Sequence, residues 1–334
     1  MRAWVAARGY PAYRAQQILS GAYRRRVASF AELSELPRDV RADLAATFAL
    51  PSLIPSLVAQ ASDGTRKVLF QLDGDARVES VLIPDPPRLT LCISSQAGCG
   101  MGCAFCATAR LGLLRNLTAT EIVGQVLAAQ RLLQADERIS NIVFMGMGEP
   151  LANYEPVRQA IEILTAEWGV GFSARRITVS TVGLLPVMQR LVRDTAVHLA
   201  VSLTATTDDQ RAALMPVNRR YPLAALLDMC RALPIPQRRR ITFEYVLLDG
   251  INDSLEDAAR LVRLLHGIRS KVNLIPFNPF PGAGFQSAPP LTIRRFQERL
   301  LAGGVHATVR ESRGRDIQAA CGQLAGEASA ARPS

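Results

Sequence analysis

Three closely spaced cysteines, Cys99, Cys103 and Cys106, constrain this chain more than any other feature of its sequence. They follow the spacing C-x3-C-x2-C within CISSQAGCGMGCAFCATAR, residues 92–110, and glycines separate them. Glycine adopts positive φ easily, so the backbone can bend three thiolates around one centre. Thiolates select soft metals and iron–sulfur clusters, but three ligands are one fewer than a closed zinc site or an ordinary cluster uses. The spacing therefore predicts a metal centre with one open coordination position.

The nature of that centre follows from what surrounds the three cysteines. A zinc site would need a fourth ligand, and the three histidines of the chain show no finger-like spacing to the triplet. Phe105 stands directly before the last cysteine. We therefore favour a [4Fe–4S] cluster, in which one iron lacks a protein ligand and can bind another molecule.

Length and hydropathy limit the class of protein. The 334 residues, 49% of them hydrophobic, suffice for one large domain and a small one. No apolar run reaches the roughly 18 residues that a membrane span needs, and residues 1–17 lack the apolar core of a secretory signal. We expect a cytoplasmic protein with no membrane segment, where clustered cysteines serve metal or redox chemistry rather than structural disulfides.

The chain is basic, with 39 Lys and Arg against 29 Asp and Glu. Much of the excess is clustered arginine, at residues 24–26, 175–176, 219–220 and 238–240 and at Arg310, Arg313 and Arg315. A surface of this kind suits a nucleic acid. An ordinary solvated surface, with arginine used in place of lysine, is the alternative.

The order of predicted elements suggests four regions. Residues 1–50 have helical periodicity, with Ser29 as a helix cap, and form an accessory domain that either only packs or also contacts RNA. Residues 51–88 form a linker and a β-hairpin extension, in which Glu79 is expected to face solvent. Residues 89–324 form the main domain. Residues 325–334 form a disordered tail.

In the main domain strands and helices alternate. The expected strands cover 89–94, 140–145, 176–181, 197–203, 241–247 and 272–276, followed by one more at 305–310. Amphipathic helices are expected near 118–134, 155–167, 184–193, 208–214, 222–232 and 255–266. This alternation predicts an α/β fold with a parallel sheet, either a partial (β/α)6 TIM-like barrel or a doubly wound sheet. In both, functional residues gather at the carboxyl ends of the strands.

Several polar or turn-forming residues follow the expected strands. These are Gly148 and Glu149, Ser180, Ser202 and Thr204, and Asn278. Each alone is typical of a turn. Because the cysteine triplet follows the first strand, all of them share one rim with a metal centre, and together they favour a functional site.

At this point the chain resembles the radical S-adenosylmethionine (SAM) enzymes, in which SAM chelates the open iron through its amino and carboxylate groups. More narrowly, CISSQ at 92–96, NLT at 116–118, MGMGEP at 145–150 and ACGQL at 320–324 resemble the RlmN/Cfr family, which methylates adenosine in RNA. The resemblance implies a radical SAM core and methylation of C2 in adenine 2503 of 23S rRNA, in the family's usual numbering, and in adenine 37 of tRNA.

The resemblance also implies a mechanism that uses two SAM molecules per turnover. One SAM methylates the residue matching Cys321, and a second is cleaved to a radical that takes hydrogen from that methyl group, which then adds to the base. The residue matching Cys92 assists proton loss and releases the product through a transient disulfide with Cys321. The residue matching Glu79 is the proton acceptor. An electron donor of the flavodoxin or ferredoxin kind is implied as a partner.

The family's SAM contacts match Gly148, Glu149, Ser180, Asn278 and the run Ser202-Leu203-Thr204. The family usually has Ser-Leu-His at this run, so the contact from Thr204 differs, since a threonine hydroxyl cannot stack or reach as imidazole does. Cys230 matches no functional position and is expected in the core.

Three other functions are compatible with the sequence. A Cfr-like enzyme would methylate C8 of the same adenine. A radical SAM enzyme that modifies proteins would have no use for Cys92 and Cys321 together. A metal-stabilised RNA-binding protein would not cleave SAM.

Overall fold

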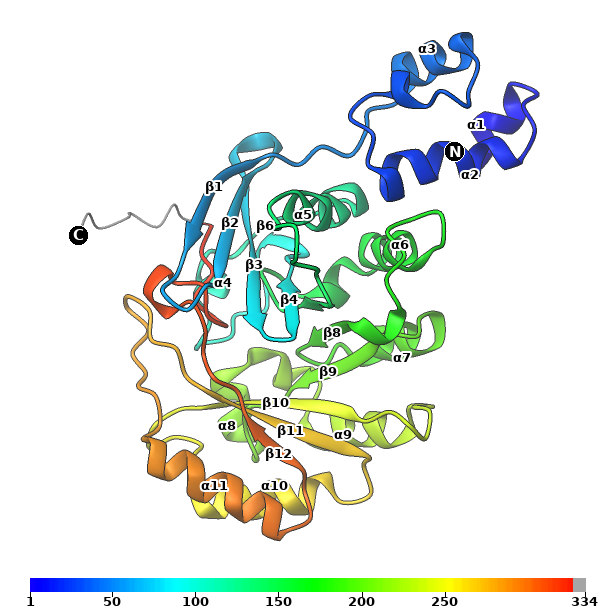
Figure 1. Ribbon diagram of the computed structural model, residues 1–334. Coiled ribbons are helices and arrows are strands. Elements are labelled where there is room, and N and C mark those ends of the chain that lie inside the picture. The colour runs from blue at the N-terminus through cyan, green and yellow to red at the C-terminus, as the bar shows by residue number, and fades with distance from the viewer. Residues whose placement is uncertain (327–334) are drawn as a thin grey trace.

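The central feature of the computed structural model, which describes residues 1–326, is a curved sheet of parallel strands (Figure 1). Its strands are β4 (Arg88–Cys92), β7 (Asn141–Phe144), β8 (Ile177–Thr181), β9 (His198–Ser202), β10 (Ile241–Leu247), β11 (Ser270–Pro276) and β12 (Ala307–Val309). They lie side by side in chain order, without the reversal that defines a doubly wound sheet. The predicted partial barrel is therefore confirmed.

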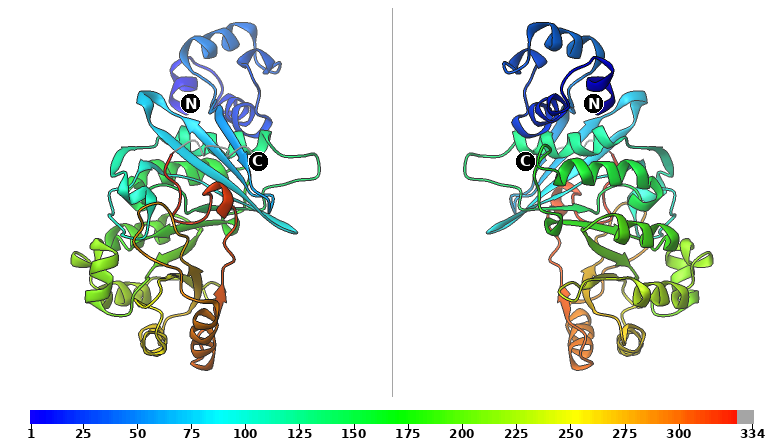
Figure 2. Two further views of the ribbon diagram at one scale, coloured as in Figure 1. Left: turned by 90° about the vertical axis from the view of Figure 1, so that its left-hand side faces the viewer. Right: turned by 90° about the vertical axis from the view of Figure 1, so that its right-hand side faces the viewer.

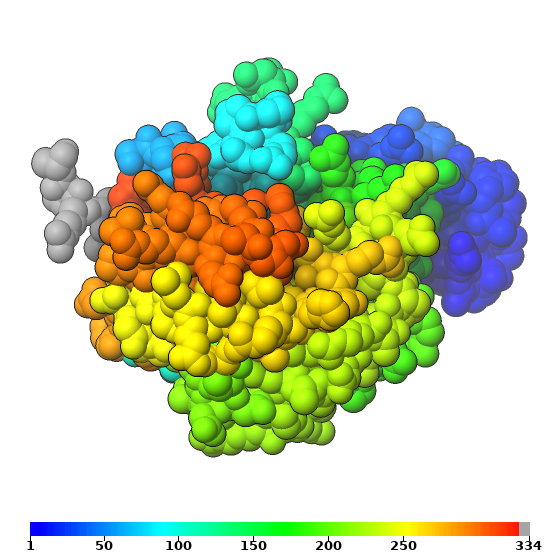
Figure 3. Space-filling model, turned by 90° about the horizontal axis from the view of Figure 1, so that it is seen from below, coloured from blue at the N-terminus to red at the C-terminus, as the bar shows by residue number. Residues whose placement is uncertain are grey.

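Helices cover the outer face of this sheet (Figures 1 and 2). They are α5 (Ala119–Arg131), α6 (Tyr154–Thr165), α7 (Leu185–Asp194), α8 (Asp208–Leu214), α9 (Leu223–Ala232), α10 (Leu255–Leu265) and α11 (Pro290–Ala302). The first six were predicted; α11 was not. α10 and α11 make up much of the lower surface (Figure 3). Thr118 and Glu121 form a capping box that fixes where α5 begins.

Strand β10 shows how the sequence divides the two faces of the sheet. Phe243, Tyr245 and Leu247 are fully buried in the main hydrophobic core. Glu244 and Val246 alternate with them and face the barrel interior, where they line a cavity. Strands of this kind separate a helix-packed face from an interior that is free to carry polar residues.

Three antiparallel strands extend the sheet before β4. They are β1 (Pro55–Gln60), β2 (Arg66–Gln71) and β3 (Arg77–Asp85). The hairpin of β2 and β3 was predicted, whereas β1 was not. The described chain thus has one sheet of ten strands, ordered β1-β2-β3-β4-β7-β8-β9-β10-β11-β12, whose end strands do not pair with each other. A separate small hairpin of β5 (Gln96–Gly98) and β6 (Leu113–Asn116), with the short helix α4 (Ala107–Arg110) between them, holds the cysteine loop.

The N-terminal helices are α1 (Arg2–Ala7), α2 (Tyr13–Ser20) and α3 (Arg38–Thr47). They pack on a small core of their own that includes Trp4, Val5, Ile18, Leu33 and Leu44. The predicted cap at Ser29 is present as a capping box with Glu32. The hydrophobic core of these helices is thus distinct from that of the main sheet, and the boundary near residue 50 stays a prediction.

Two arginines of the first basic cluster connect this helical region to the main domain. Arg24 donates to the Glu167 carbonyl at 3.0 Å, and Arg26 donates to the Gln130 side chain at 3.2 Å. These contacts support a packing role for the cluster. Within the described residues, no helix is long and apolar enough to cross a membrane.

A buried arginine ties the carboxyl ends of β8 and β9 together. Arg211 on α8 has no exposed surface, and its guanidinium donates to the carbonyl groups of Val182 at 2.7 Å, Ser202 at 3.3 Å and Leu203 at 3.3 Å. Burial lowers its pKa to about 10, so the charge persists at neutral pH. This side chain sets the spacing of the strand ends that form the cavity wall.

We expect Arg211→Met to lower the free energy of unfolding by about 3 kcal/mol, because several buried carbonyl groups lose their donors. Urea unfolding followed by circular dichroism measures the change. The exposed Arg219 in the next turn is the matched control, and Arg219→Met should change stability by less than about 0.5 kcal/mol. Equal stability of the two variants would contradict this role for Arg211.

Candidate active site

The carboxyl ends of the parallel strands surround a cavity. Most of the predicted site residues line it: Cys99, Cys103, Cys106, Gly148, Glu149, Ser180, Ser202, Thr204, Asn278 and Cys321. Leu203 has its side chain in the hydrophobic core instead. Cys92 and Glu79 are absent from the described lining of the cavity.

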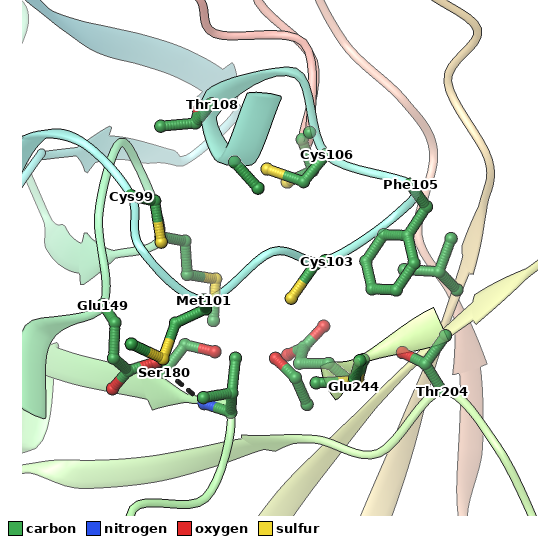
Figure 4. A pocket seen from close by; sticks show the side chains of 18 of the residues that line it. Cys99, Met101, Cys103, Phe105, Cys106, Thr108, Glu149, Ser180, Thr204 and Glu244 are labelled. Atoms are coloured by element: carbon green, nitrogen blue, oxygen red, sulfur yellow. Dashed lines mark hydrogen bonds between the residues drawn. The ribbon is translucent and has the colours of Figure 1, made fainter. Parts of the chain in front are cut away.

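The cysteine loop is shaped by a close backbone contact. The Cys99 amide donates to the Gly112 carbonyl at 2.8 Å, and this brings the β6 side of the hairpin against Gly98. Gly98 has φ +73°, and a Cβ atom there would lie 2.0 Å from the same carbonyl oxygen, so glycine is required. The thiols of Cys99, Cys103 and Cys106 project from this loop at one side of the cavity (Figure 4).

The three thiols are in an environment that disfavours free thiolates. Burial raises the pKa of Cys99 to about 11, and the Cys106 thiol adds to the increase. Burial likewise raises the pKa values of Cys103 and Cys106. A positively charged metal centre would reverse this, because it stabilises the thiolate form.

Glu149 lines the cavity close to Cys99, whose thiol contacts the Glu149 backbone (Figure 4). Its carboxylate accepts hydrogen bonds from the amides of Leu151 at 3.0 Å and Val182 at 2.9 Å. Burial nevertheless raises its pKa to about 7. Gly148 precedes it at φ +95°, and a Cβ atom there would lie 2.5 Å from the Gln96 Cβ, so the turn can pack this closely only with glycine.

Thr204, where the family usually has histidine, adopts a conformation that is rare for its residue type. Its φ is +56°, a left-handed value that costs a β-branched residue about 1–3 kcal/mol. Its hydroxyl is buried and has no hydrogen-bond partner among the described residues, although the side chain lines the cavity. An unpaired hydroxyl at a cavity wall is suited to hydrogen-bond a ligand there.

Glu244 is a cavity residue that was not predicted from the sequence. It stands in register with Ser202 on β9 and with Asn273 on β11, whose amide donates to its carboxylate at 3.1 Å. The Thr308 hydroxyl donates to the side-chain oxygen of Asn273 at 3.2 Å. Burial raises the pKa of Glu244. The signal in the sequence was a lone charge inside the apolar strand ITFEYVL.

Cys92 and Cys321 are brought together from distant parts of the chain. Both are free thiols. Burial raises the pKa of Cys92 to about 12, and the Cys321 thiol adds to the increase, whereas the Arg310 guanidinium opposes it. Arg310 was expected among the surface arginines that suit RNA; it is half-buried instead and lies near Cys321, whose thiol raises its pKa. A cation beside the buried Cys92 thiol favours the thiolate form of Cys92.

The C-terminal segment 314–326 carries Cys321 to the cavity. The Asn278 side chain donates to the Cys321 carbonyl at 3.1 Å. The Thr108 hydroxyl, just after the cysteine loop, donates to the Leu324 carbonyl at 2.6 Å. These bonds hold the segment against the same loop that presents the three thiols.

Glu79 is not at the surface, so the expectation that it faces solvent was wrong. It has no exposed area, and its carboxylate forms an ion pair with Lys67 at 2.9 Å. It also accepts hydrogen bonds from the amides of Ala325 and Gly326, both at 3.0 Å. The C-terminal segment covers this face of the hairpin and excludes water from it. The remaining residues of the predicted tail, 327–334, lie outside the described part of the chain.

Comparison with known proteins agrees with this geometry. Residues 93–262 match the radical SAM superfamily. A protein of Geobacter sulfurreducens named dual-specificity RNA methyltransferase RlmN is 54% identical over 327 residues, covering 98% of this chain and 90% of that protein. A protein of the same name from Syntrophobacter fumaroxidans is 52% identical, covering 97% of this chain and 95% of its own length. The crystal structure of a radical SAM methyltransferase from Sphaerobacter thermophilus has 50% sequence identity to this chain. The superposition covers 98% of this chain and 96% of that chain, with a TM-score of 0.92.

The radical SAM superfamily implies a [4Fe–4S] cluster and SAM, and the residues of the cavity fit both. Three thiols line one side of it, and each would be stabilised as a thiolate by a metal centre. Glu149 and the unpaired hydroxyl of Thr204 also line the cavity and offer polar groups to a ligand. The cysteine triplet and the Cys92–Cys321 pair are both present. Because the chain is about 50% identical to RlmN proteins over nearly its whole length, it belongs to the RlmN family within the radical SAM superfamily.

Proposed function

We propose that this protein methylates C2 of adenine 2503 in 23S rRNA and of adenine 37 in tRNA. The observation that carries the proposal is the position of Cys321, which lines the same cavity as the cysteine triplet and has Cys92 as its neighbour. A radical SAM enzyme needs the triplet alone to cleave SAM. In addition to the triplet, this chain has Cys321, whose thiol can hold a methyl group, and Cys92, whose thiol can release the product.

Cys321 acts as the methyl carrier. Its thiolate takes a methyl group from one SAM. When bound, the cluster supplies the electron that cleaves a second SAM. Two SAM molecules are therefore used in each turnover. Cys99, Cys103 and Cys106 would hold the cluster, and Gly148, Glu149, Ser180, Ser202, Leu203, Thr204 and Asn278 would contact SAM.

Product release follows from the chemistry of two neighbouring thiols. After the carbon on Cys321 has joined C2 of the base, the adduct loses the C2 proton and its unpaired electron, which the bound cluster would take back. Cys92 then attacks the Cys321 sulfur. An S–S bond forms and the S–C bond breaks, and the electron pair stays on the carbon, which takes up a proton to become the methyl group. The disulfide must then be reduced by an external thiol. The family assigns the role of proton acceptor to the residue matching Glu79, whose carboxylate in this chain is bound by Lys67 and by the amides of Ala325 and Gly326.

The electron for SAM cleavage must come from outside the chain. We propose a low-potential one-electron protein of the flavodoxin or ferredoxin class as the donor. The two RNA substrates would be held in part by exposed arginines, such as Arg219 and Arg220, because phosphate contacts supply most of the affinity for RNA.

Glu149 is expected to bind the ammonium group of SAM. Glu149→Gln removes the charge and keeps the shape, so the Kd for SAM should rise by ~30-fold or more. Because the pKa of Glu149 is about 7, SAM binding should also weaken as the pH falls below 7 in the parent protein, and not in the variant. Equilibrium dialysis measures both effects. The affinity for 5′-methylthioadenosine, which lacks the ammonium group, is the control and should not change; an equal loss for both ligands would contradict the assignment.

The proposed reaction is tested by reconstituting the protein without oxygen and supplying SAM, a reductant and either 23S rRNA or tRNA. Nucleoside mass spectrometry should find 2-methyladenosine in both RNAs. A product methylated at C8 would replace the proposal with the Cfr-like reaction. SAM cleavage without RNA methylation would favour an enzyme that modifies proteins, for which neither RNA nor Cys321 is needed.

A further inference from the structure

The position of Cys321 depends on a segment that has little regular structure. Between residues 314 and 326 the only helical element described is a single 3-10 turn, Arg315–Ile317. The thiol itself lies on a backbone with no strand or helix on either side. Its placement therefore depends on the packing of Ala319 and Leu324 in the main hydrophobic core and on the hydrogen bonds that the segment makes with the rest of the chain.

Some of these hydrogen bonds are accepted by Glu79, which forms a buried ion pair with Lys67 on the β2–β3 hairpin. Glu79 has no exposed area and Lys67 has 4%, and their charged groups are 2.9 Å apart. One carboxylate oxygen faces Lys67, and the other accepts from the amides of Ala325 and Gly326, each at 3.0 Å. Both oxygens of Glu79 are thus engaged. Charge-assisted bonds of this kind are roughly twice as strong as neutral ones.

The strand register places this ion pair on the same face of the sheet as Cys92. Val81 on β3 stands opposite Cys92 on β4, and Glu79 lies two residues before Val81, so all three side chains point to one face. Lys67 stands opposite Val81 on β2 and shares that face. The segment bearing Cys321 is therefore held against the face that presents Cys92.

A proton acceptor has to reach the reacting base. Among the described residues, Glu79 lines none of the cavity in which Cys321 and the cysteine triplet meet. The carboxylate that does face this cavity from the barrel interior, besides Glu149, is Glu244. Glu79 is engaged instead with the residues that follow Cys321 (Figures 1 and 2 show the C-terminal segment beside β2 and β3).

We propose that Glu79 is a positioning residue for Cys321. Its carboxylate, held by Lys67, binds the Ala325 and Gly326 amides and so keeps the Cys321 thiol in the cavity and beside Cys92. This inference rests on the proposed role of Cys321 as methyl carrier, and it assigns Glu79 a task in the first half of the reaction, methylation of Cys321.

The test uses neutral variants of the ion pair. Glu79→Gln keeps an oxygen that can accept from the two amides, but it leaves the Lys67 charge buried without a partner, so Cys321 methylation and RNA methylation should both fall by ~10-fold or more. The double variant Glu79→Gln with Lys67→Met removes that charge. It should restore Cys321 methylation and RNA methylation to within about threefold of the levels of the parent protein, since a weaker neutral hydrogen bond remains. Peptide mass spectrometry measures the methylated fraction of Cys321, and gel electrophoresis measures any covalent RNA adduct.

The proton-acceptor role predicts a different pattern. Cys321 would still be methylated in Glu79→Gln, a covalent adduct with RNA would accumulate, and Lys67→Met would restore nothing, because glutamine is not a base. That pattern would overturn the proposal. If the parent protein itself failed to methylate RNA, the proposed function would fail, while the methylation state of Cys321 would still report on its position.

A truncation tests the same bonds without changing the ion pair. A chain that ends at residue 324 lacks both amides, whereas a chain that ends at residue 326 keeps them and is the matched control. The shorter chain should lose Cys321 methylation by ~10-fold and the control should not. Equal activity of the two chains, or an equal loss in both, would contradict the proposal.

Discussion

Replacing Cys321 by alanine is expected to reduce RNA methylation to the background level, a loss of ~10⁴-fold or more, as for other residues that form a covalent intermediate. The reason is that the methyl group has no other carrier: C2 of adenine is not nucleophilic, and the cavity places Cys321 beside the three cluster thiols. Transfer of a labelled methyl group from SAM to tRNA measures the effect. Reductive cleavage of SAM should persist in the variant, because the cysteine triplet is intact.

The control for this experiment is another buried thiol. Cys230 on α9 is 3% exposed and belongs to the main hydrophobic core, away from the cavity. Cys230→Ala should keep methyl transfer near the parent rate. Normal turnover by Cys321→Ala would refute the carrier role, and a similar loss in both variants would point to a general effect of removing a thiol.

Replacing Cys92 by alanine is expected to trap the protein on its substrate. Without the thiol that attacks the Cys321 sulfur, the carbon bridge between Cys321 and the base has no route to release, so product formation should fall by ~10³-fold or more. A covalent protein–RNA species should appear instead and be visible as a shifted band on a denaturing gel. Digestion and mass spectrometry should locate the linkage at Cys321.

The double variant Cys92→Ala with Cys321→Ala distinguishes this trap from nonspecific cross-linking. It lacks the carrier and should form no adduct. Free product from Cys92→Ala at a normal rate would show that another group releases the RNA, and Arg310 and Glu244 would then be the next residues to examine, because Arg310 interacts with both the cysteine pair and Glu244.

Most of the barrel was predictable because its strands are short apolar runs separated by amphipathic helices. The order of strands in the sheet then follows from their order in the chain. The elements that were missed lack such a signal. Strand β1 is largely exposed, so its residues carry no alternating pattern. The β5–β6 hairpin is only a few residues long on each side and is held by the contact between Gly98 and Gly112.

The cysteine residues of the site were predictable from spacing and resemblance, but the surroundings of Glu79 were not. A glutamate in a two-stranded ribbon normally faces water. Here residues 325–326, some 246 positions later in the chain, close over it, and Lys67 from the neighbouring strand balances its charge. Contacts of such long range leave no periodic mark in a sequence. The position of Arg310 was missed for the same reason, whereas Glu244 left a signal, a lone charge inside an apolar strand.

Thr204 shows where this chain departs from the family's usual pattern. The threonine keeps a left-handed backbone conformation and an unpaired hydroxyl at the cavity wall. The Asn252 amide helps to hold this backbone conformation, because it donates to the Thr204 carbonyl at 2.7 Å.

The most direct test of the carrier mechanism follows the methyl group itself. Protein whose Cys321 carries an isotopically labelled methyl group is mixed with unlabelled SAM, a reductant and tRNA, and a single turnover is analysed by nucleoside mass spectrometry. We predict that the label appears in the methyl group at C2 of adenine and that Cys321 loses it. An unlabelled RNA product, with the label still on Cys321, would contradict this mechanism.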